Sequence, residues 1–290
     1  MTKPSGQGRE HATVDSLDLW KPKVPRIYDY FLGGKDNFAH DREVMEEVRR
    51  HVPDAPLMAR ENRAFLRRAV RDLAASGIRQ FVDIGAGMPV EAGAHQNVHE
   101  IAQHTAPDAR VAYVDIDPVV ASHGRALLGK SPGVAVIQGD ARYPEDILAD
   151  PELRGVIDLD EPVAVIMLAM LHFIGDEDDP QGIVARLRAA MAPGSHVVIS
   201  HSTSEFDTDG RVQKAADVYR KASSPLTLRD RAGILSLFDG FDLLDPGLTT
   251  LSLWRPEPTT GSVWRSGPGT AAPPGAERQW IYAGVGRKTD

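Results

Sequence analysis

From residue 80 onward, short apolar runs alternate with segments in which apolar residues recur every three or four positions. The short runs predict strands and the amphipathic segments predict helices. The predicted strands are residues 80–84, 110–115, 134–138, 162–168, 195–201, 242–253 and 279–286. The predicted helices lie near residues 96–104, 118–128, 144–149, 180–191 and 208–222, with another from Thr227 to Phe238. Because strands and helices alternate, the pattern indicates a doubly wound α/β sheet that is mostly parallel.

The chain before this alternation has only helical periodicity. A short helix within residues 25–38 should end at the Gly33-Gly34 pair, since glycine commonly follows the last turn of a helix. A second helix is expected over residues 38–51 and a third from about Pro56 to Gly77. The third helix carries several arginines, which are typical of a solvated face: Arg60, Arg63, Arg67, Arg68 and Arg71.

These patterns divide the chain into three parts. We expect a flexible, polar tail at residues 1–16, a helical cap or lid at 17–77, and one larger domain at 78–290. Within the larger domain, residues 255–277 are rich in Pro, Gly, Ser and Thr, a composition that predicts a mobile loop.

Charge and composition narrow the class of partner. The 290 residues include 33 Lys and Arg against 41 Asp and Glu, so no overall positive field attracts nucleic acid or an anionic membrane. The absence of cysteine excludes disulfides, thiolate nucleophiles and cysteine zinc sites. No secretory signal or membrane-spanning run is evident, so we expect a cytoplasmic protein that acts on small molecules. The composition indicates no particular oligomeric state.

A glycine turn follows the first predicted strand. The run 80–84 is apolar apart from Gln80 and Asp83, and the segment Gly85-Ala86-Gly87 comes directly after it. Glycine allows positive φ and a close approach of the backbone to a ligand. Ligands of doubly wound sheets bind at the carboxyl ends of the strands, so this turn is a candidate ligand loop.

Acidic residues follow the next two predicted strands. Asp115 and Asp117 end the second strand, and Asp140 follows the third. A carboxylate can accept hydrogen bonds from two ribose hydroxyls or from an exocyclic amino group. Asp117 also precedes a proline, which is typical of a residue that caps a helix. Three acids around one crevice make a poor phosphate site.

The acidic crevice argues against a dinucleotide. The turn lacks the third glycine of Gly-x-Gly-x-x-Gly, and Pro89 follows closely. Asp115 also lies further from Gly87 than the roughly 20 residues expected in a dinucleotide fold. A ligand with ribose, adenine and a positive centre fits better. An NAD-dependent oxidoreductase remains an alternative at this point, as does a cofactor-binding module without catalysis.

These residues resemble the class I S-adenosylmethionine-dependent methyltransferases. Three further segments resemble an actinobacterial-type family of S-adenosyl methyltransferases, long classed as a domain of unknown function: 26–37 (RIYDYFLGGKDN), 61–65 (ENRAF) and 171–173 (LHF). The resemblance covers the chain from about Ser16 to Lys288. It implies a Rossmann-like sheet of seven strands with the last one antiparallel, and S-adenosylmethionine as cofactor.

The resemblance also implies roles for individual residues. Asp115 would bind the ribose, Ile116 the adenine ring and Asp140 the adenine amino group, with Asp83 beneath the amino acid part. The full set of implied cofactor residues is Asp83, Gly85, Ala86, Gly87, Asp115, Ile116, Asp117, Gly139, Asp140, Ala141 and Leu168. The aromatic residues of the segment 25–38 could pack on the main core or form a lid over the cofactor, with Gly33-Gly34 as the bend, and we expect the lid. The predicted lid or substrate residues are Arg26, Tyr28, Gly33, Gly34, Lys35 and Arg63.

Methyl transfer needs a general base only if the acceptor must lose a proton. His172, just past the fourth predicted strand, is the candidate for that role, and His201 is a second one. No metal site is expected. His95 and His99 lack an evident third ligand, and the acidic run 176–179 is typical of a solvated loop.

Overall fold

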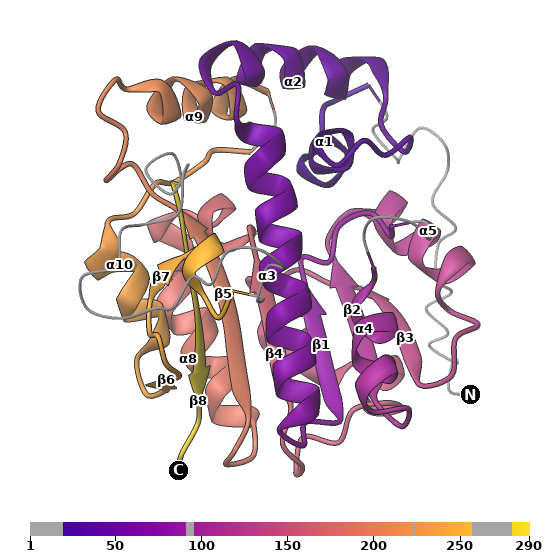
Figure 1. Ribbon diagram of the computed structural model, residues 1–290. Coiled ribbons are helices and arrows are strands. Elements are labelled where there is room, and N and C mark those ends of the chain that lie inside the picture. Colours follow the sequence, from indigo (N-terminus) through magenta and orange to yellow (C-terminus); the bar gives the residue numbers. More distant parts are fainter. Residues whose placement is uncertain (1–19, 91–95, 223, 257–279) are drawn as a thin grey trace, which may run out of the picture.

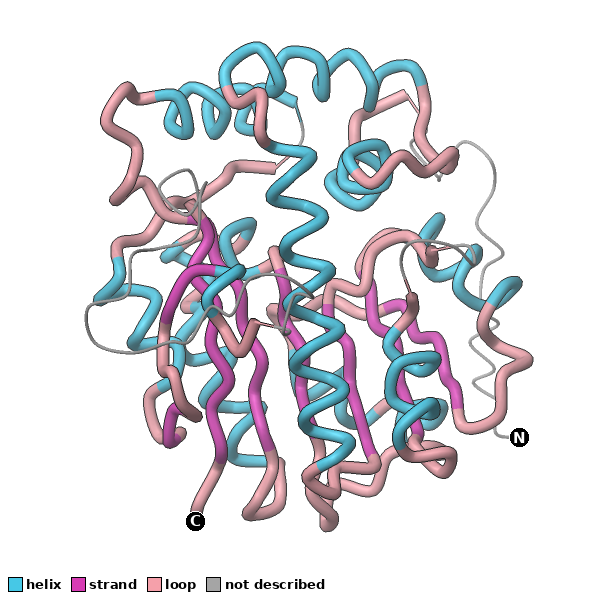
Figure 2. The backbone as a smooth tube through the Cα atoms, viewed as in Figure 1, coloured by secondary structure: helices cyan, strands magenta, loops and turns pink. Residues whose placement is uncertain are grey.

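The computed structural model describes residues 20–90, 96–222, 224–256 and 280–290 (Figure 1). The expected tail at residues 1–16 and most of the loop at 255–277 lie outside the described residues. Helices cover both faces of a central sheet, and a group of helices lies above the carboxyl ends of its strands (Figures 1 and 2). No helix in the described part of the chain is long and apolar enough to cross a membrane.

The sheet confirms the predicted fold class. Its strand order is β3-β2-β1-β4-β5-β8-β6, and β7 pairs with β8. Strands β1 to β5 pair in parallel, whereas β8 is antiparallel to β5, β6 and β7. The strands are β1 (Gln80–Ile84), β2 (Arg110–Asp115), β3 (Val134–Gln138), β4 (Ala164–Leu168), β5 (His196–Ser202), β6 (Asp242–Leu243), β7 (Thr249–Thr250) and β8 (Ile281–Arg287).

Alternating side chains of the central strands supply two hydrophobic cores. On one face, Phe81 and Ile166 pack in a cluster with the long helix α3. On the other face, Val82 and Val165 pack in a cluster with α8. The helices around the sheet are α3 (Ala55–Ala75), α4 (Val98–Thr105), α5 (Pro118–Leu127), α6 (Pro144–Ala149), α7 (Pro151–Arg154), α8 (Pro180–Ala190) and α10 (Arg231–Leu235). Burial on both faces explains why these strands lack a polar side.

The cap consists of α1 (Val24–Phe31), α2 (Ala39–His51) and α9 (Arg211–Ala222) (Figure 1). A third hydrophobic cluster includes Ile27 of α1, Met45 of α2 and Ala215 of α9. Helix α9 follows β5 in the chain, so the cap combines two N-terminal helices with one that comes after the parallel strands.

Arg68 corrects the expectation that the arginines of the third helix face solvent. Its side chain is buried, and its guanidinium donates to the carbonyl oxygens of Trp254 (2.9 Å) and Leu251 (2.5 Å). These bonds attach α3 to the 3₁₀ helix η5 (Leu251–Leu253). Arg60 and Arg67 are exposed, as expected.

The predicted strand at 242–253 is wrong, because it breaks into β6, β7 and η5. Pro246 lacks an N–H for the sheet ladder, and Gly247 has a φ of 82°. These two residues interrupt the strand between β6 and β7.

The predicted helix start at Thr227 is also wrong. Helix α10 begins at Arg231, and the 3₁₀ helix η4 (Ser236–Phe238) follows it. Asp230 caps the helix, since its carboxylate accepts a hydrogen bond from the N–H of Gly233 (2.8 Å).

Asp207 holds the start of α9, and Asp207→Ala should destabilise the protein by about 1–2 kcal/mol. Its carboxylate accepts hydrogen bonds from the N–H groups of Arg211 (2.8 Å), Val212 (2.9 Å) and Gln213 (3.2 Å). Chemical denaturation measures the loss, and hydrogen exchange should place it at α9. Asp209→Ala is the control, because its exposed ion pair with Arg211 contributes little. Equal stability of the two variants would contradict this role.

Candidate active site

The glycine turn folds over the tip of β2. The N–H groups of Gly85 and Ala86 donate to the carbonyl oxygen of Val114 (2.8 and 3.1 Å). Gly85 has a φ of 74°, and a Cβ there would lie 2.8 Å from the Cβ of Met170. Gly87 has a φ of 70° and open space where a side chain would be. Both positions therefore favour glycine for its backbone conformation, and the space at Gly87 leaves room for a ligand.

Asp115 ties the glycine turn to the end of β2. Its carboxylate accepts hydrogen bonds from the N–H groups of Gly87 (2.9 Å) and Asp117 (2.9 Å). Burial raises the pKa of Asp115 to about 6, against the pull of these backbone donors. Asp117 caps α5, because it accepts a hydrogen bond from the N–H of Val119 (2.8 Å). Each carboxylate oxygen has a second lone pair, so Asp115 can still accept from a ligand.

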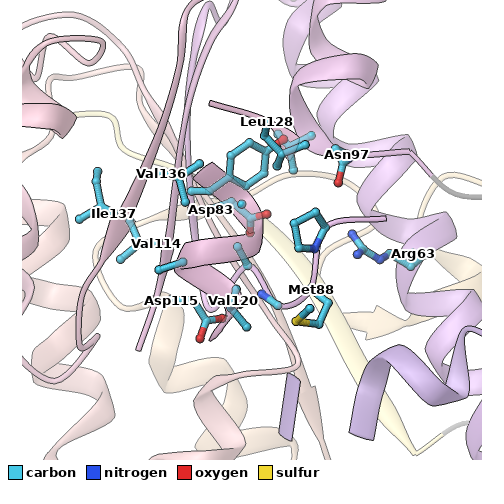
Figure 3. Close-up of a pocket in the computed structure, with 17 residues that line it drawn as sticks. Arg63, Asp83, Met88, Asn97, Val114, Asp115, Val120, Leu128, Val136 and Ile137 are labelled. Atoms are coloured by element: carbon cyan, nitrogen blue, oxygen red, sulfur yellow. Dashed lines mark hydrogen bonds between the residues drawn. The ribbon is translucent and has the colours of Figure 1, made fainter. Parts of the chain in front are cut away.

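A pocket opens beside this turn (Figure 3). Apolar side chains of β2, β3 and α5 line part of it, and polar side chains line the rest. The polar members are Arg63, Asp83, Asn97, Tyr113 and Asp115. The structure thus places Asp83, Ala86, Gly87 and Asp115 of the predicted cofactor residues around one pocket, together with Arg63 of the predicted lid residues.

An acidic and a basic side chain, Asp83 and Arg63, lie in this pocket without a hydrogen-bond partner. Burial raises the pKa of Asp83 to about 7, while Arg63 lowers it and Asp115 raises it. Within the described residues, no group donates a hydrogen bond to the Asp83 carboxylate. Arg63 reaches from α3 toward the glycine turn, and its Nε is buried without a partner (Figure 3). Buried polar groups are normally paired, so this arrangement indicates a ligand that pairs them.

Other predicted cofactor residues lie at the neighbouring strand ends but do not line this pocket. Ile116 follows β2 and is 55% exposed. Gly139 follows β3, and its N–H donates to the carbonyl oxygen of Asp115 (3.0 Å). Ala141 is buried after β3, and Leu168 is half-buried at the end of β4.

Asp140 is held by Arg142 in this structure. The guanidinium donates from Nε to both carboxylate oxygens (3.0 Å each) and from a terminal nitrogen to one of them (2.6 Å). Partial burial raises the pKa of Asp140, but the hydrogen bonds from Arg142 outweigh it and keep that pKa below its usual range. An adenine amino group would have to share this carboxylate with Arg142.

The predicted lid residues occupy different positions. Arg26 is fully buried, with Nε 3.3 Å from an Asp41 carboxylate oxygen, and it does not line the pocket. Gly34 packs on the Asp29 carboxylate, where a Cβ would clash, and Gly33 has a φ of 81°. Lys35 is exposed on the same turn. These contacts connect α1 to α2 and shape the turn between them.

Tyr28 links the cap to the strand ends through residues that the sequence analysis did not single out. Its hydroxyl donates to the carbonyl oxygen of Ala59 (3.1 Å) and accepts from Asn62 Nδ2 (3.1 Å). Asn62 Oδ1 accepts from the Ser200 hydroxyl (2.7 Å), and Ser200 Oγ accepts from the N–H of Ala169 (2.9 Å). Ala169 has a φ of 51°, which is uncommon outside glycine. A polar residue, Asn62, on the apolar face of α3 is the sequence signal that could have revealed this series of hydrogen bonds.

His172 and His201 lie together past the ends of β4 and β5. Their ring centroids are 5.4 Å apart. Burial lowers the pKa of both rings, to about 4 for His201, and the nearby Arg229 lowers them further. Both imidazoles are therefore neutral near pH 7. Arg229, which the sequence analysis did not assign to the site, donates to His201 Nε2 (2.8 Å).

The described residues contain no group of three His, Cys, Asp or Glu side chains that could hold a metal ion. His99 instead contacts the hydroxyl of Tyr113 through its backbone N–H (2.8 Å) and Nδ1 (2.9 Å). His95 lies outside the described residues.

A parallel sheet with an antiparallel β8, a glycine turn after β1 and an acid at the end of β2 define a Rossmann-like domain for an adenosine-type cofactor. A family profile described as S-adenosyl methyltransferase matches residues 10–289, and the chain belongs to this family. Its cofactor is therefore S-adenosylmethionine, and it is a methyltransferase by family.

Two solved structures are similar over nearly the whole chain. One is a DUF574 family protein from Streptomyces avermitilis, which is 38% identical with a TM-score of 0.84, and 94% of this chain and 99% of that chain are covered. The other is a proposed methyltransferase from Thermobifida fusca, which is 39% identical with a TM-score of 0.83, and the coverage is 94% and 97%. A search of curated proteins found no match.

Proposed function

We propose that the protein transfers a methyl group from S-adenosylmethionine to a small-molecule acceptor, and that Asp83 and Arg63 bind the amino acid part of the cofactor. The observation that carries this proposal is the pair of opposite charges without hydrogen-bond partners in one pocket. An α-amino acid presents an ammonium and a carboxylate a few ångströms apart. Asp83 would accept from the ammonium, and Arg63 would donate to the carboxylate.

The remaining cofactor residues would have separate tasks. Asp115 would accept from the ribose hydroxyls, and its bonds to Gly87 and Asp117 hold the carboxylate in place for that. Ile116, exposed at the end of β2, offers an apolar contact for the adenine ring. Asp140 would accept from the adenine amino group beside Arg142.

When bound, the cofactor supplies a methyl carbon whose bond to sulfur breaks as the acceptor atom bonds to it, the electron pair staying on sulfur. The protein's contribution is to align the acceptor and to exclude water. The cap of α1, α2 and α9 lies over the strand ends, where it would cover the acceptor and exclude water (Figure 1).

His172 is better placed as a hydrogen-bond donor than as a base. Its Nδ1 accepts a hydrogen bond from the N–H of Ser202 (3.2 Å), so the proton of the neutral ring lies on Nε2. We therefore propose that His172 donates to the acceptor molecule.

His172→Ala should leave cofactor affinity within about twofold, because the ring lies on the acceptor side. Calorimetric titration with S-adenosylhomocysteine measures the effect, on samples whose folding is checked by circular dichroism. A loss of tenfold or more in a folded variant would assign His172 to the cofactor.

Side-by-side titration of S-adenosylmethionine and NADH tests the proposed cofactor. We expect saturable binding of S-adenosylmethionine alone, since NADH has no amino acid group for Asp83 and Arg63. Preferential binding of NADH would support an oxidoreductase. If S-adenosylmethionine binds but no acceptor from a broad metabolite panel is methylated, a binding module without catalysis becomes the better interpretation.

A further inference from the structure

A row of aromatic rings extends from the cofactor pocket to His172 beneath the cap. Tyr28 of α1 and Tyr219 of α9 both pack against the hydrophobic cluster of the cap, and the Tyr28 hydroxyl accepts a hydrogen bond from Asn62, which precedes Arg63 in α3. The ring centroids of Tyr219 and Phe173 are 5.5 Å apart, and those of Phe173 and His172 are 4.6 Å apart. Because Arg63 lines the cofactor pocket, this row begins beside the site proposed for the amino acid part.

Three residues of this row are partly exposed, whereas His172 at its end is buried. Tyr28, Phe173 and Tyr219 are half-buried, and so are Leu168 and Met170 at the end of β4. The preceding residues of β4 are fully buried. Partial exposure in the middle of the molecule, between the cap and the strand ends, indicates a face that a ligand can contact.

Most polar groups along this face are already paired. The Tyr28 hydroxyl bonds Ala59 and Asn62, and the Asn62 side chain bonds Ser200. His201 donates from Nδ1 to the carbonyl oxygen of Ser202 (2.8 Å) and accepts from Arg229 at Nε2. A ligand that used these groups would have to break existing hydrogen bonds.

Arg229 does not offer a free positive charge here. Besides His201, its guanidinium donates to the carbonyl oxygens of Leu171 (3.2 Å) and Ile174 (2.9 Å) and to the carboxylate of Asp176 (2.6 Å). Its charge is therefore compensated, so the His172 end of the row does not favour an anionic acceptor.

Two neutral donors remain. Within the described residues, the Tyr219 hydroxyl and His172 Nε2 have no hydrogen-bond partner. Burial and the nearby Tyr28 raise the pKa of Tyr219, so its hydroxyl keeps its proton. The face thus combines aromatic rings with two uncharged donors.

We propose that the methyl acceptor is an uncharged aromatic molecule with an oxygen substituent, which packs against Phe173 and Tyr219 and accepts a hydrogen bond from the Tyr219 hydroxyl. This inference rests on the proposed function, because it places the acceptor next to the cofactor pocket. Aromatic pairs in offset or edge-to-face contact attract each other beyond the effect of burial alone, which favours a flat ring over an aliphatic one.

Three probes of similar size test the proposal: 2-naphthol, its saturated analogue decahydro-2-naphthol, and naphthalene. Ligand-observed NMR titration on protein loaded with S-adenosylhomocysteine gives the affinities. We expect 2-naphthol to bind at least about threefold more tightly than decahydro-2-naphthol. Tyr219→Phe keeps the ring and removes the hydroxyl, so it should weaken 2-naphthol about fivefold and leave naphthalene unchanged.

Tyr143→Phe is the matched control, because Tyr143 is 59% exposed beyond β3 and outside the row. It should leave all three affinities unchanged. Absence of 2-naphthol binding at millimolar concentration, equal binding of the saturated analogue, or no effect of Tyr219→Phe would overturn the proposal. Binding of S-adenosylhomocysteine is measured on the same samples, so failure of the cofactor assignment is seen separately.

Discussion

Asp83→Asn should stabilise the protein without ligand at about pH 8 while weakening its binding of S-adenosylmethionine. The buried Asp83 carboxyl has a pKa of about 7, whereas an unfolded chain ionises it near 3.8. Ionising Asp83 therefore costs more in the folded state than in the unfolded chain, by about 1.4 kcal/mol for each unit by which the pKa is raised. The charges of Arg63 and Asp115 also act on the Asp83 carboxylate. For the neutral amide of the variant we therefore expect a gain of roughly 2–4 kcal/mol in the free energy of unfolding.

The pH dependence of this gain follows from the raised pKa. Protonated Asp83 contributes to the free energy of unfolding. This contribution is fully present below about pH 4 and is lost as the pH rises through about 7. The variant and the wild type should therefore be equally stable near pH 4 and diverge by about pH 8. Urea denaturation at both pH values measures this, with the exposed Asp108→Asn as the control. A variant that is no more stable than the wild type at about pH 8 would contradict the buried, unpaired carboxylate.

Cofactor binding should change in the opposite direction. Loss of the charge-assisted bond to the cofactor's ammonium costs about 1.5–3 kcal/mol, or roughly 10–100-fold in affinity. A protein that is more stable but binds less well is the pattern expected when a residue is kept for its ligand.

Arg63→Gln should weaken S-adenosylhomocysteine binding by roughly 10–100-fold, because it removes the cation that pairs with the ligand's carboxylate. The same variant should bind 5′-methylthioadenosine as the wild type does, since that compound has the nucleoside and the sulfur but no amino acid. Calorimetric titration of both ligands separates a local effect from general damage to the site.

Arg60→Gln is the matched control for Arg63→Gln. Arg60 lies on the same helix, is exposed and does not line the pocket. It should leave both affinities unchanged. An equal loss for the two ligands in Arg63→Gln would show that Arg63 supports the whole pocket and does not select the amino acid part.

Local sequence signals were sufficient for the parallel strands of the sheet and for the glycine turn. The apolar run that ends at Ile84 predicted β1, and glycines at 85 and 87 predicted a turn that needs positive φ, which both adopt. The acid at the end of the second predicted strand placed Asp115, because parallel strands end at the same edge of a sheet.

Packing between distant segments could not be predicted in the same way. Helix α9 joins the cap because its apolar residues meet those of α1 and α2, and nothing in its own periodicity names that partner. Arg68 has the sequence context of a solvated arginine, yet carbonyl groups of η5 bind it in the interior. The hydrogen bond between Arg142 and Asp140 likewise depends on side-chain conformations, which a sequence motif does not specify.

The placement of Asp83 and Arg63 in one pocket could not be predicted from local signals either. Each residue was singled out from its own segment, and only the fold places them around one pocket. Asp83 and Asp115 lie around one pocket as their strand ends suggested, whereas Asp117 and Asp140 do not line it. The basic side chain opposite the acids was not predicted from the spacing.

A crystal structure of the protein with S-adenosylhomocysteine tests the central claim most directly. We expect the ligand's ammonium within hydrogen-bond distance of the Asp83 carboxylate, its carboxylate on the Arg63 guanidinium and its ribose on Asp115. An amino acid part that contacts neither Asp83 nor Arg63, or a nucleoside bound away from Asp115, would contradict the account.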